Sequence, residues 1–159
     1  MHTKDITILG IMLGIIIILT TLEVMLMPLP ILPPHVKPGL ANIVIMYCVF
    51  NIGSKQAIVL NVLKALFVLL TRGTLAGLLS LGGGILSIAV IILLTCRSKS
   101  SYTTISVSGA CAHNIGQFIA LVVLLSTPAL VYYLPVLIVS GIVFGIITGS
   151  ILKIVMMKS

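Results

Sequence analysis

The chain has 159 residues, of which 60% are hydrophobic and 7% are charged, and its mean hydropathy is +1.37. A soluble core of this length cannot bury so much apolar surface, so the composition excludes an ordinary soluble domain and predicts an integral membrane protein. The formal net charge of +7 does not indicate nucleic-acid binding, because the basic residues are scattered at helix ends without a basic helix or aromatic platform.

Repeated long apolar runs predict membrane-spanning helices, since the strands of a membrane barrel alternate polar and apolar residues. A helix needs about 20 mostly apolar residues to cross a bilayer. We therefore expect an all-α, polytopic membrane protein in which residues 1–159 form a single transmembrane domain without a soluble domain. The six predicted transmembrane helices are 6–27, 39–53, 55–71, 73–96, 102–125 and 131–157.

The first predicted helix is too long and continuous for a cleavable signal peptide, and no Ala-x-Ala motif follows it. It carries Gly10 and Gly14 four residues apart, a small-xxx-small pattern that lets another helix approach closely. Glu23 lies about 220° around the helix from Gly10, on nearly the opposite face. Packing within the bundle and packing against a partner protein fit the two glycines equally well.

The segment "MPLPILPPHVKPG" follows the first helix, and its five prolines are Pro28, Pro30, Pro33, Pro34 and Pro38. Proline presets much of the backbone, so this segment excludes a regular helix. Two interpretations fit it equally well: a stiff connector, or a lid over a binding site that faces the outside.

The next three predicted helices contain breaks or glycines. The helices at 39–53 and 55–71 are short and are separated only by "NIGSKQ", in which Gly53 and Ser54 interrupt the apolar pattern. The glycine triplet Gly82–Gly84 is a candidate kink in the helix at 73–96.

The basic residues predict the orientation, because cytoplasmic loops carry an excess of lysine and arginine. With both termini in the cytoplasm, only Lys37 and Arg72 lie outside, and Lys64 is assigned to neither side. The opposite orientation inverts this ratio, so we expect cytoplasmic N- and C-termini in a bacterial cytoplasmic membrane. The basic residues on the inside are then Lys4, Lys55, Arg97, Lys99, Lys153 and Lys158.

Polar side chains within membrane spans are costly and usually face the bundle interior or a wet cavity. On the predicted topology they gather at mid-depth or in the outer half. We therefore predict a one-sided binding pocket that opens to the outside, because a channel is expected to carry polar groups through its full depth. The predicted substrate-binding residues are Glu23, Asn42, Asn61, Lys64, Arg72, His113, Asn114 and Gln117.

The stretch "SGACAHNIGQF" places three of these residues on one helix. At about 100° per residue, Gln117 and Asn114 lie about 40° and about 100° from His113, within one face. Each side chain alone fits an interhelical hydrogen bond of about 0.6–2 kcal/mol. Three on one face favour a binding site.

Structural roles also fit several of the other polar residues. Lys64 could pair with Glu23, the acidic residue available within the membrane region. Arg72 and Lys37 fit residues that snorkel to the membrane interface. Asn42 fits a cap at the start of its short helix. The outer half nevertheless contains more cations than anions. This excess predicts an anionic or strongly polar substrate.

The sequence contains no recognisable catalytic or metal-binding arrangement. Asp5 and Glu23 are its only acidic residues, so it lacks the aspartate clusters with which a prenyl diphosphate synthase holds Mg²⁺. It also lacks a GxxxxGK[ST] phosphate loop, a credible Ser-His-Asp or Cys-His set, and a metal-ligand cluster. We expect a protein without enzyme activity, metal or cofactor that binds or transports a small molecule.

Three segments, "LPPHVKPGLANIV", "GACAHNIGQ" and "LVYYLPVLIVSGIVFGIITG", resemble the Gx transporter family, whose members are often labelled heptaprenyl diphosphate synthase component I. The resemblance covers nearly the whole chain. This family is similar to the substrate-binding S components of energy-coupling factor (ECF) transporters. Those proteins have six helices and bind vitamins or related compounds from outside.

The resemblance implies specific partners and ligands. A membrane coupling (T) subunit and two ABC ATPase subunits are the expected partners, and Gly10 and Gly14 would contact the coupling subunit. S components commonly have alanine at these positions, so glycine departs from the pattern in residue type while remaining small. The resemblance also implies that residues 31–39 close over the substrate, for which flavin-like and isoprenoid-diphosphate-like molecules are candidates.

Two other functions compete with an S component. The first is a non-catalytic membrane accessory protein of polyprenyl diphosphate or quinone metabolism, which binds no solute. The second is a small self-sufficient carrier, which transports without ATPase partners. Membrane lipid surrounds the protein under each hypothesis, and none involves nucleic acid.

Overall fold

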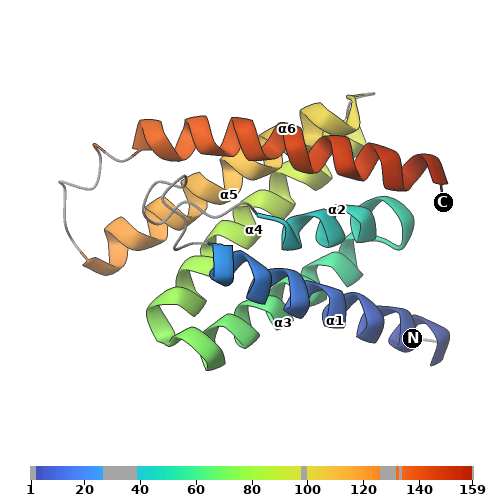
Figure 1. Ribbon diagram of the computed structural model, residues 1–159, viewed down its shortest axis with the longest axis horizontal. Helices are drawn as coiled ribbons and strands as arrows, with labels where there is room; N and C mark the ends of the chain where they lie inside the picture. The colour runs from blue at the N-terminus through green and yellow to red at the C-terminus, as the bar shows by residue number, and fades with distance from the viewer. Residues whose placement is uncertain (1–2, 27–38, 98–99, 126–131, 133, 159) are drawn as a thin grey trace.

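A computed structural model describes residues 3–26, 39–97, 100–125, 132 and 134–158 (Figure 1). This part of the chain is all-α, and the predicted helices are present with ends within three residues of the predicted ones. The protein is thus an all-α polytopic membrane bundle. Its helices are α1 (Thr3–Leu26), α2 (Ala41–Asn51), α3 (Ser54–Arg72), α4 (Thr74–Arg97), α5 (Tyr102–Leu125) and α6 (Leu134–Lys158).

The short helix α2 departs from the expectation of six full membrane crossings. Five described helices are long and apolar enough to cross a membrane, whereas α2 has 11 residues. At about 1.5 Å per residue it spans about 16 Å, roughly half of a hydrocarbon core of about 30 Å. It lies between Gly39 and Gly53, whose φ angles of 72° and 145° suit glycine and favour a break there. Figure 1 shows α2 beside the half of the bundle that contains both termini.

The glycines of α4, α5 and α6 let these helices pack closely. A Cβ atom added at Gly116 would lie 2.7 Å from the carbonyl oxygen of Gly82, and one at Gly145 would lie 2.6 Å from Cα of Val107. Helix α4 is continuous through Gly82–Gly84, and a Cβ atom at Gly83 would lie 2.7 Å from the carbonyl oxygen of His113. The triplet is therefore a packing surface for the neighbouring helices.

Helix α1 packs chiefly against α2 and α3. Its buried face consists of Leu9, Met12, Ile16, Thr20 and Glu23. Gly10 and Gly14 are exposed, and a Cβ atom at either position would have no heavy atom within 4 Å. The two glycines and Glu23 therefore lie on different faces of α1, in agreement with their helical spacing.

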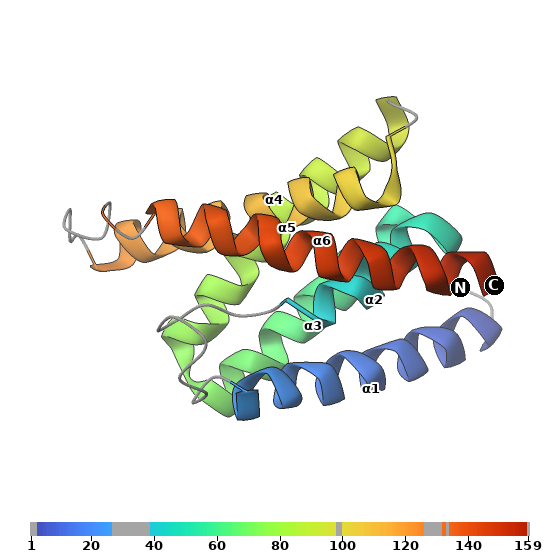
Figure 2. The same ribbon diagram turned by 45° about the horizontal axis from the view of Figure 1, so that its top comes forward.

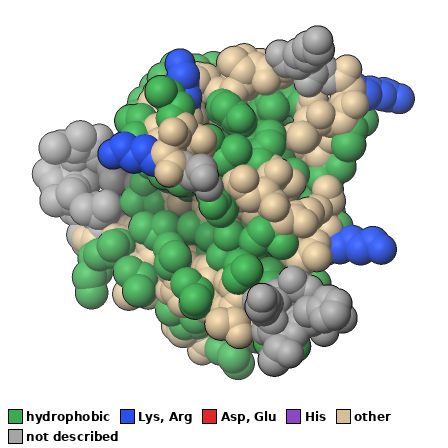
Figure 3. Space-filling view, turned by 90° about the vertical axis from the view of Figure 1, so that its right-hand side faces the viewer, with side chains coloured by type: hydrophobic (Ala, Val, Ile, Leu, Met, Phe, Trp, Pro, Cys, Tyr) green, Lys and Arg blue, Asp and Glu red, His purple; other side chains and the backbone are tan. Residues whose placement is uncertain are grey.

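The two ends of the bundle differ in character. Both termini lie at the same end in the two ribbon views (Figures 1 and 2). Figure 3 looks onto this end and shows apolar side chains between Lys and Arg side chains at the rim. Buried apolar residues of α2, including Ile45, Met46 and Val49, belong to the core cluster of the protein. The cavity described next lies at the N-terminal end of α2.

Candidate functional site

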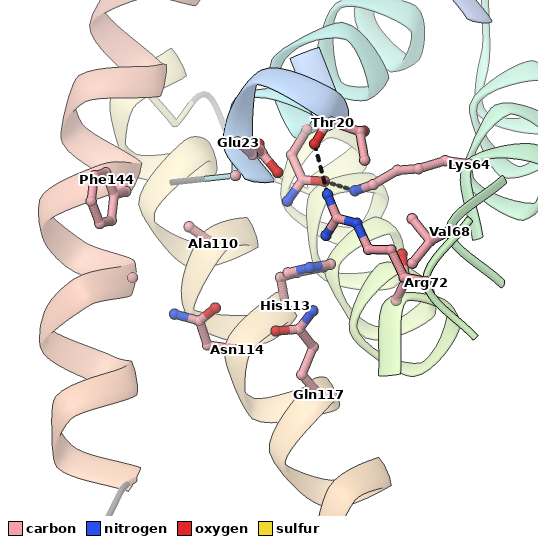
Figure 4. A pocket seen from close by; sticks show the side chains of 14 residues that line it. Thr20, Glu23, Lys64, Val68, Arg72, Ala110, His113, Asn114, Gln117 and Phe144 are labelled. Atoms are coloured by element: carbon pink, nitrogen blue, oxygen red, sulfur yellow. Dashed lines mark hydrogen bonds between the residues drawn. The ribbon is translucent and has the colours of Figure 1, made fainter. Parts of the chain in front are cut away.

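Four helices bring most of the predicted binding residues around one cavity (Figure 4). Its predicted members are Glu23, Asn42, Lys64, Arg72, His113, Asn114 and Gln117. The remaining lining residues are Thr20, Gly39, Val68, Ser80, Ala110, Gly141 and Phe144. The cavity therefore combines two cations, one carboxylate and several amides and hydroxyls with a few small or apolar side chains.

Helices α1, α2 and α3 are tied together at the cavity by hydrogen bonds. Lys64 donates from Nζ to Oδ1 of Asn42 at 2.7 Å, and Arg72 donates from Nη2 to the carbonyl oxygen of Thr20 at 2.8 Å. The backbone N–H of Ala41 donates to Oε1 of Glu23 at 3.1 Å. Glu23 thus caps the first turn of α2, where the helix dipole favours a negative charge.

The three polar residues of α5 all line the cavity but point in different directions. Figure 4 shows the ring of His113 and the amide of Gln117 on the side facing Arg72 and Lys64, whereas Asn114 points towards α6. The Nδ2 atom of Asn114 donates to the carbonyl oxygen of Leu137 at 2.7 Å and lies 3.3 Å from Oγ of Ser140. Its amide therefore connects α5 to α6.

Asn61 lies outside the cavity lining. It is 2% exposed, and a Cβ atom added at Gly84 of α4 would overlap its side-chain amide. Its Oδ1 atom has no hydrogen-bond partner among the described residues. Helical spacing places Asn61 near Lys64, but the close approach of α3 and α4 at Gly84 buries Asn61 between these helices.

Several lining residues were not predicted from the sequence. Thr20 lies three residues before Glu23, on the same face of α1, and this spacing is the signal that points to it. Ser80 and Phe144 carry no comparable signal, because hydroxyl and aromatic side chains are common in membrane helices. A second, smaller cavity shares Gly39, Asn42 and Ala110 with the first and also includes Ser87, Ser106 and Thr148.

The first cavity is small for a vitamin-like ligand. Its volume is about 30 Å³, room for about two water molecules. Pockets for drug-sized ligands commonly measure about 300–1,000 Å³. A ligand of that size therefore requires the surrounding side chains and helices to move apart.

Two other sequence predictions concern segments around the cavity. Most of the proline-rich segment, including all five prolines and Lys37, lies outside the described residues; Gly39, at the end of the segment, is described and lines the cavity. Within the described part of the chain, no group of three or more His, Cys, Asp or Glu residues is placed to hold a metal ion. The described lining residues are therefore suited to bind a ligand by hydrogen bonds and charge rather than through a metal ion.

Comparison with known proteins identifies the family of the chain. A family model described as heptaprenyl diphosphate synthase component I matches residues 12–155. No match was found among curated proteins or among solved structures. The matched region includes α2 to α5, most of α1 and α6, and all of the described residues that line the cavity. On this evidence the chain belongs to the heptaprenyl diphosphate synthase component I family.

Proposed function

We propose that this protein is the substrate-binding S component of an ECF-type importer, which captures a small polar or anionic molecule from outside. The observation that carries the proposal is the convergence of Glu23, Asn42, Lys64, Arg72, His113 and Gln117 on one cavity of a membrane bundle. Polar side chains at membrane depth are costly, and a group of them around a common space is typical of a binding site.

The asymmetry of the bundle supports capture from one side. Strongly polar side chains surround the cavity at the N-terminal end of α2, while the rest of α2 contributes to an apolar core. Both termini lie at the opposite end, with Lys55, Arg97 and Lys158 at helix ends there. By the positive-inside rule, that end is cytoplasmic and the cavity belongs to the outer half.

The exposed glycine face of α1 supports a coupling partner. Gly10 and Gly14 are uncovered, and Ile11, Ile15 and Ile18 are exposed on the same helix. A helix of the coupling subunit is able to approach the α1 backbone closely along this stripe. The chain lacks an ATP-binding loop, so reorientation of the loaded protein would depend on the two ATPase subunits.

The small volume of the cavity gives α1 a second role in this proposal. Because α1 packs chiefly against α2 and α3, it is the wall whose displacement disturbs the close packing of α4, α5 and α6 least. Movement of α1 would enlarge the cavity for a vitamin-sized ligand. It would also shift the glycine face that the coupling subunit contacts.

The decisive experiment combines ligand identification with cavity variants. Native mass spectrometry of the gently purified protein is expected to detect a co-purifying small molecule. His113→Ala and Lys64→Ala are expected to weaken its binding at least tenfold, while each variant keeps a helical circular dichroism spectrum. Lys55→Ala, an exposed position on the same helix as Lys64, serves as the control and should bind normally. Unchanged affinity in both cavity variants would rule out this site.

The second candidate function is a non-catalytic accessory protein of polyprenyl diphosphate metabolism, and the description of its family favours it. That role predicts stable association with a synthase and no tightly bound small molecule after purification. Affinity purification from native membranes, followed by protein identification, separates the two functions.

A further inference from the structure

Among the described residues, three charged side chains line the cavity, two of them cationic and one anionic. Glu23 and Lys64 are each 5% exposed, and Arg72 is half-buried. Counted over the described lining residues, with His113 neutral, the formal charge of the cavity is therefore one positive unit. An uncompensated charge is unfavourable in a membrane interior, so the ligand that fits best is one that neutralises this excess.

The three charged side chains make hydrogen bonds to different neighbours. Glu23 accepts from the backbone N–H of Ala41, so its charge is stabilised at the positive end of the α2 dipole. Lys64 donates a hydrogen bond to Oδ1 of Asn42, and Arg72 donates one to the carbonyl oxygen of Thr20. A guanidinium has five N–H donors, and the Thr20 carbonyl engages only one nitrogen of Arg72.

Thr20 supplies an independent indication of a ligand at this position. Thr20 lines the cavity and is 2% exposed, and its Oγ1 atom has no hydrogen-bond partner among the described residues. The hydroxyls of Thr21, Thr71 and Thr95 instead donate to the carbonyl four residues earlier in their helices. A buried hydroxyl without such a bond is unfavourable unless another group binds it.

We propose that the ligand of this cavity carries a single negative charge on a group that binds between Lys64, Arg72 and the hydroxyl of Thr20. Glu23 remains on the N-terminus of α2 and sets the charge that the cavity accepts. A carboxylate and a phosphodiester both have this charge, whereas a phosphate monoester has about two. The inference rests on the proposed role of the cavity as a ligand site and adds the charge class of the ligand.

The experiment compares small anions in the purified full-length protein. Acetate is the singly charged probe, and methyl phosphate at pH 8 is the doubly charged probe. Choline, at matched ionic strength, is the cationic control. The unfolding midpoint is measured against probe concentration and converted to an apparent affinity for each probe. The wild-type protein is expected to be stabilised by acetate more than by methyl phosphate, and not by choline.

Charge variants then test the role of Glu23. Glu23→Gln keeps a side-chain oxygen for Ala41 but raises the formal charge of the cavity to two, so it should shift the preference towards methyl phosphate about tenfold. Lys64→Met should remove the response to both anions, and Arg72→Gln provides the same test if Lys64→Met does not fold. Lys55→Met, at an exposed position of the same helix, should behave as the wild type.

Three results would overturn the inference: stabilisation of the wild-type protein by choline but not by acetate, no response to either anion, or an unchanged preference in Glu23→Gln. A failure of this kind is distinguishable from failure of the proposed function. Ligand capture and association with a coupling subunit are measured separately, and both are compatible with a neutral or cationic ligand.

Discussion

At the scale of single residues, neighbouring polar side chains on one helix have different structural roles. Asn114 and Gln117 both line the cavity, but the amide of Asn114 bonds to the backbone of α6. Within the described part of the chain, the amide of Gln117 makes no hydrogen bond, and its Cγ atom lies against Gly83. Sequence spacing places the two residues within one face and does not separate these roles, because the position of α6 decides which amide meets a backbone carbonyl.

The difference predicts separable effects of two alanine substitutions. Asn114→Ala should lower the free energy of unfolding by about 1 kcal/mol, because it removes an interhelical hydrogen bond. Gln117→Ala should change it by less than about 0.5 kcal/mol and should instead weaken binding of the co-purifying ligand. Unfolding in detergent and ligand titration measure the two effects. Equal destabilisation by both variants, with normal ligand binding in Gln117→Ala, would show that Gln117 is also structural.

At the scale of elements, α1 and α2 give the protein its asymmetry. Helix α2 begins beside Glu23 of α1 and ends after 11 residues, so its N-terminus lies at the cavity. This places a helix dipole and a backbone N–H donor at a polar site within the membrane region. Helix α1 presents Thr20 and Glu23 to the cavity and exposes Gly10 and Gly14 elsewhere on its surface.

The exposed glycines predict a defect in assembly without a defect in folding. Gly10→Leu or Gly14→Leu should abolish co-purification with the proposed coupling subunit, because leucine prevents close approach of a second helix. The fold should persist, since a Cβ atom at either position has no heavy atom within 4 Å. Ser150→Leu, at an exposed position of α6, adds the same side chain to another surface and serves as the control. Undiminished co-purification of both glycine variants would refute the predicted contact.

At the scale of the whole molecule, the two ends of the bundle differ, and this difference predicts its orientation in the membrane. Both termini lie at one end, which carries basic residues at helix ends, and the polar cavity lies away from it. Helix α4 connects the two ends, from Thr74 to Cys96 and Arg97. Thr74 and Cys96 are both exposed and so provide natural positions for a test of orientation.

A membrane-impermeant maleimide should label Cys96 in inside-out vesicles and not in intact cells. Cys48 is buried and Cys111 is half-buried, so Cys96→Ser should remove most of the labelling. Thr74→Cys in the Cys96→Ser background should be labelled in intact cells. The mass shift of the protein measures the labelling. The reverse labelling pattern would place the termini outside and the cavity on the cytoplasmic side.

The sequence by itself determined the class of fold and the charged, amide and imidazole side chains among the described residues of the cavity lining. Apolar runs of sufficient length must become helices in a bilayer, because the backbone has no other hydrogen-bond partners there. The cost of burying Lys64, Arg72 or His113 among lipid likewise requires them to face the interior. Both constraints depend on the residue types along the chain, so the sequence is sufficient to predict them.

The tertiary structure alone decided how the interior is divided. It excluded Asn61 from the cavity because Gly84 lets α4 approach α3, and it added Thr20, which shares a face with Glu23. It also shortened α2 and placed its first turn against the Glu23 carboxylate. Each of these features depends on the distance between helices, which close packing sets through side chains distant in sequence.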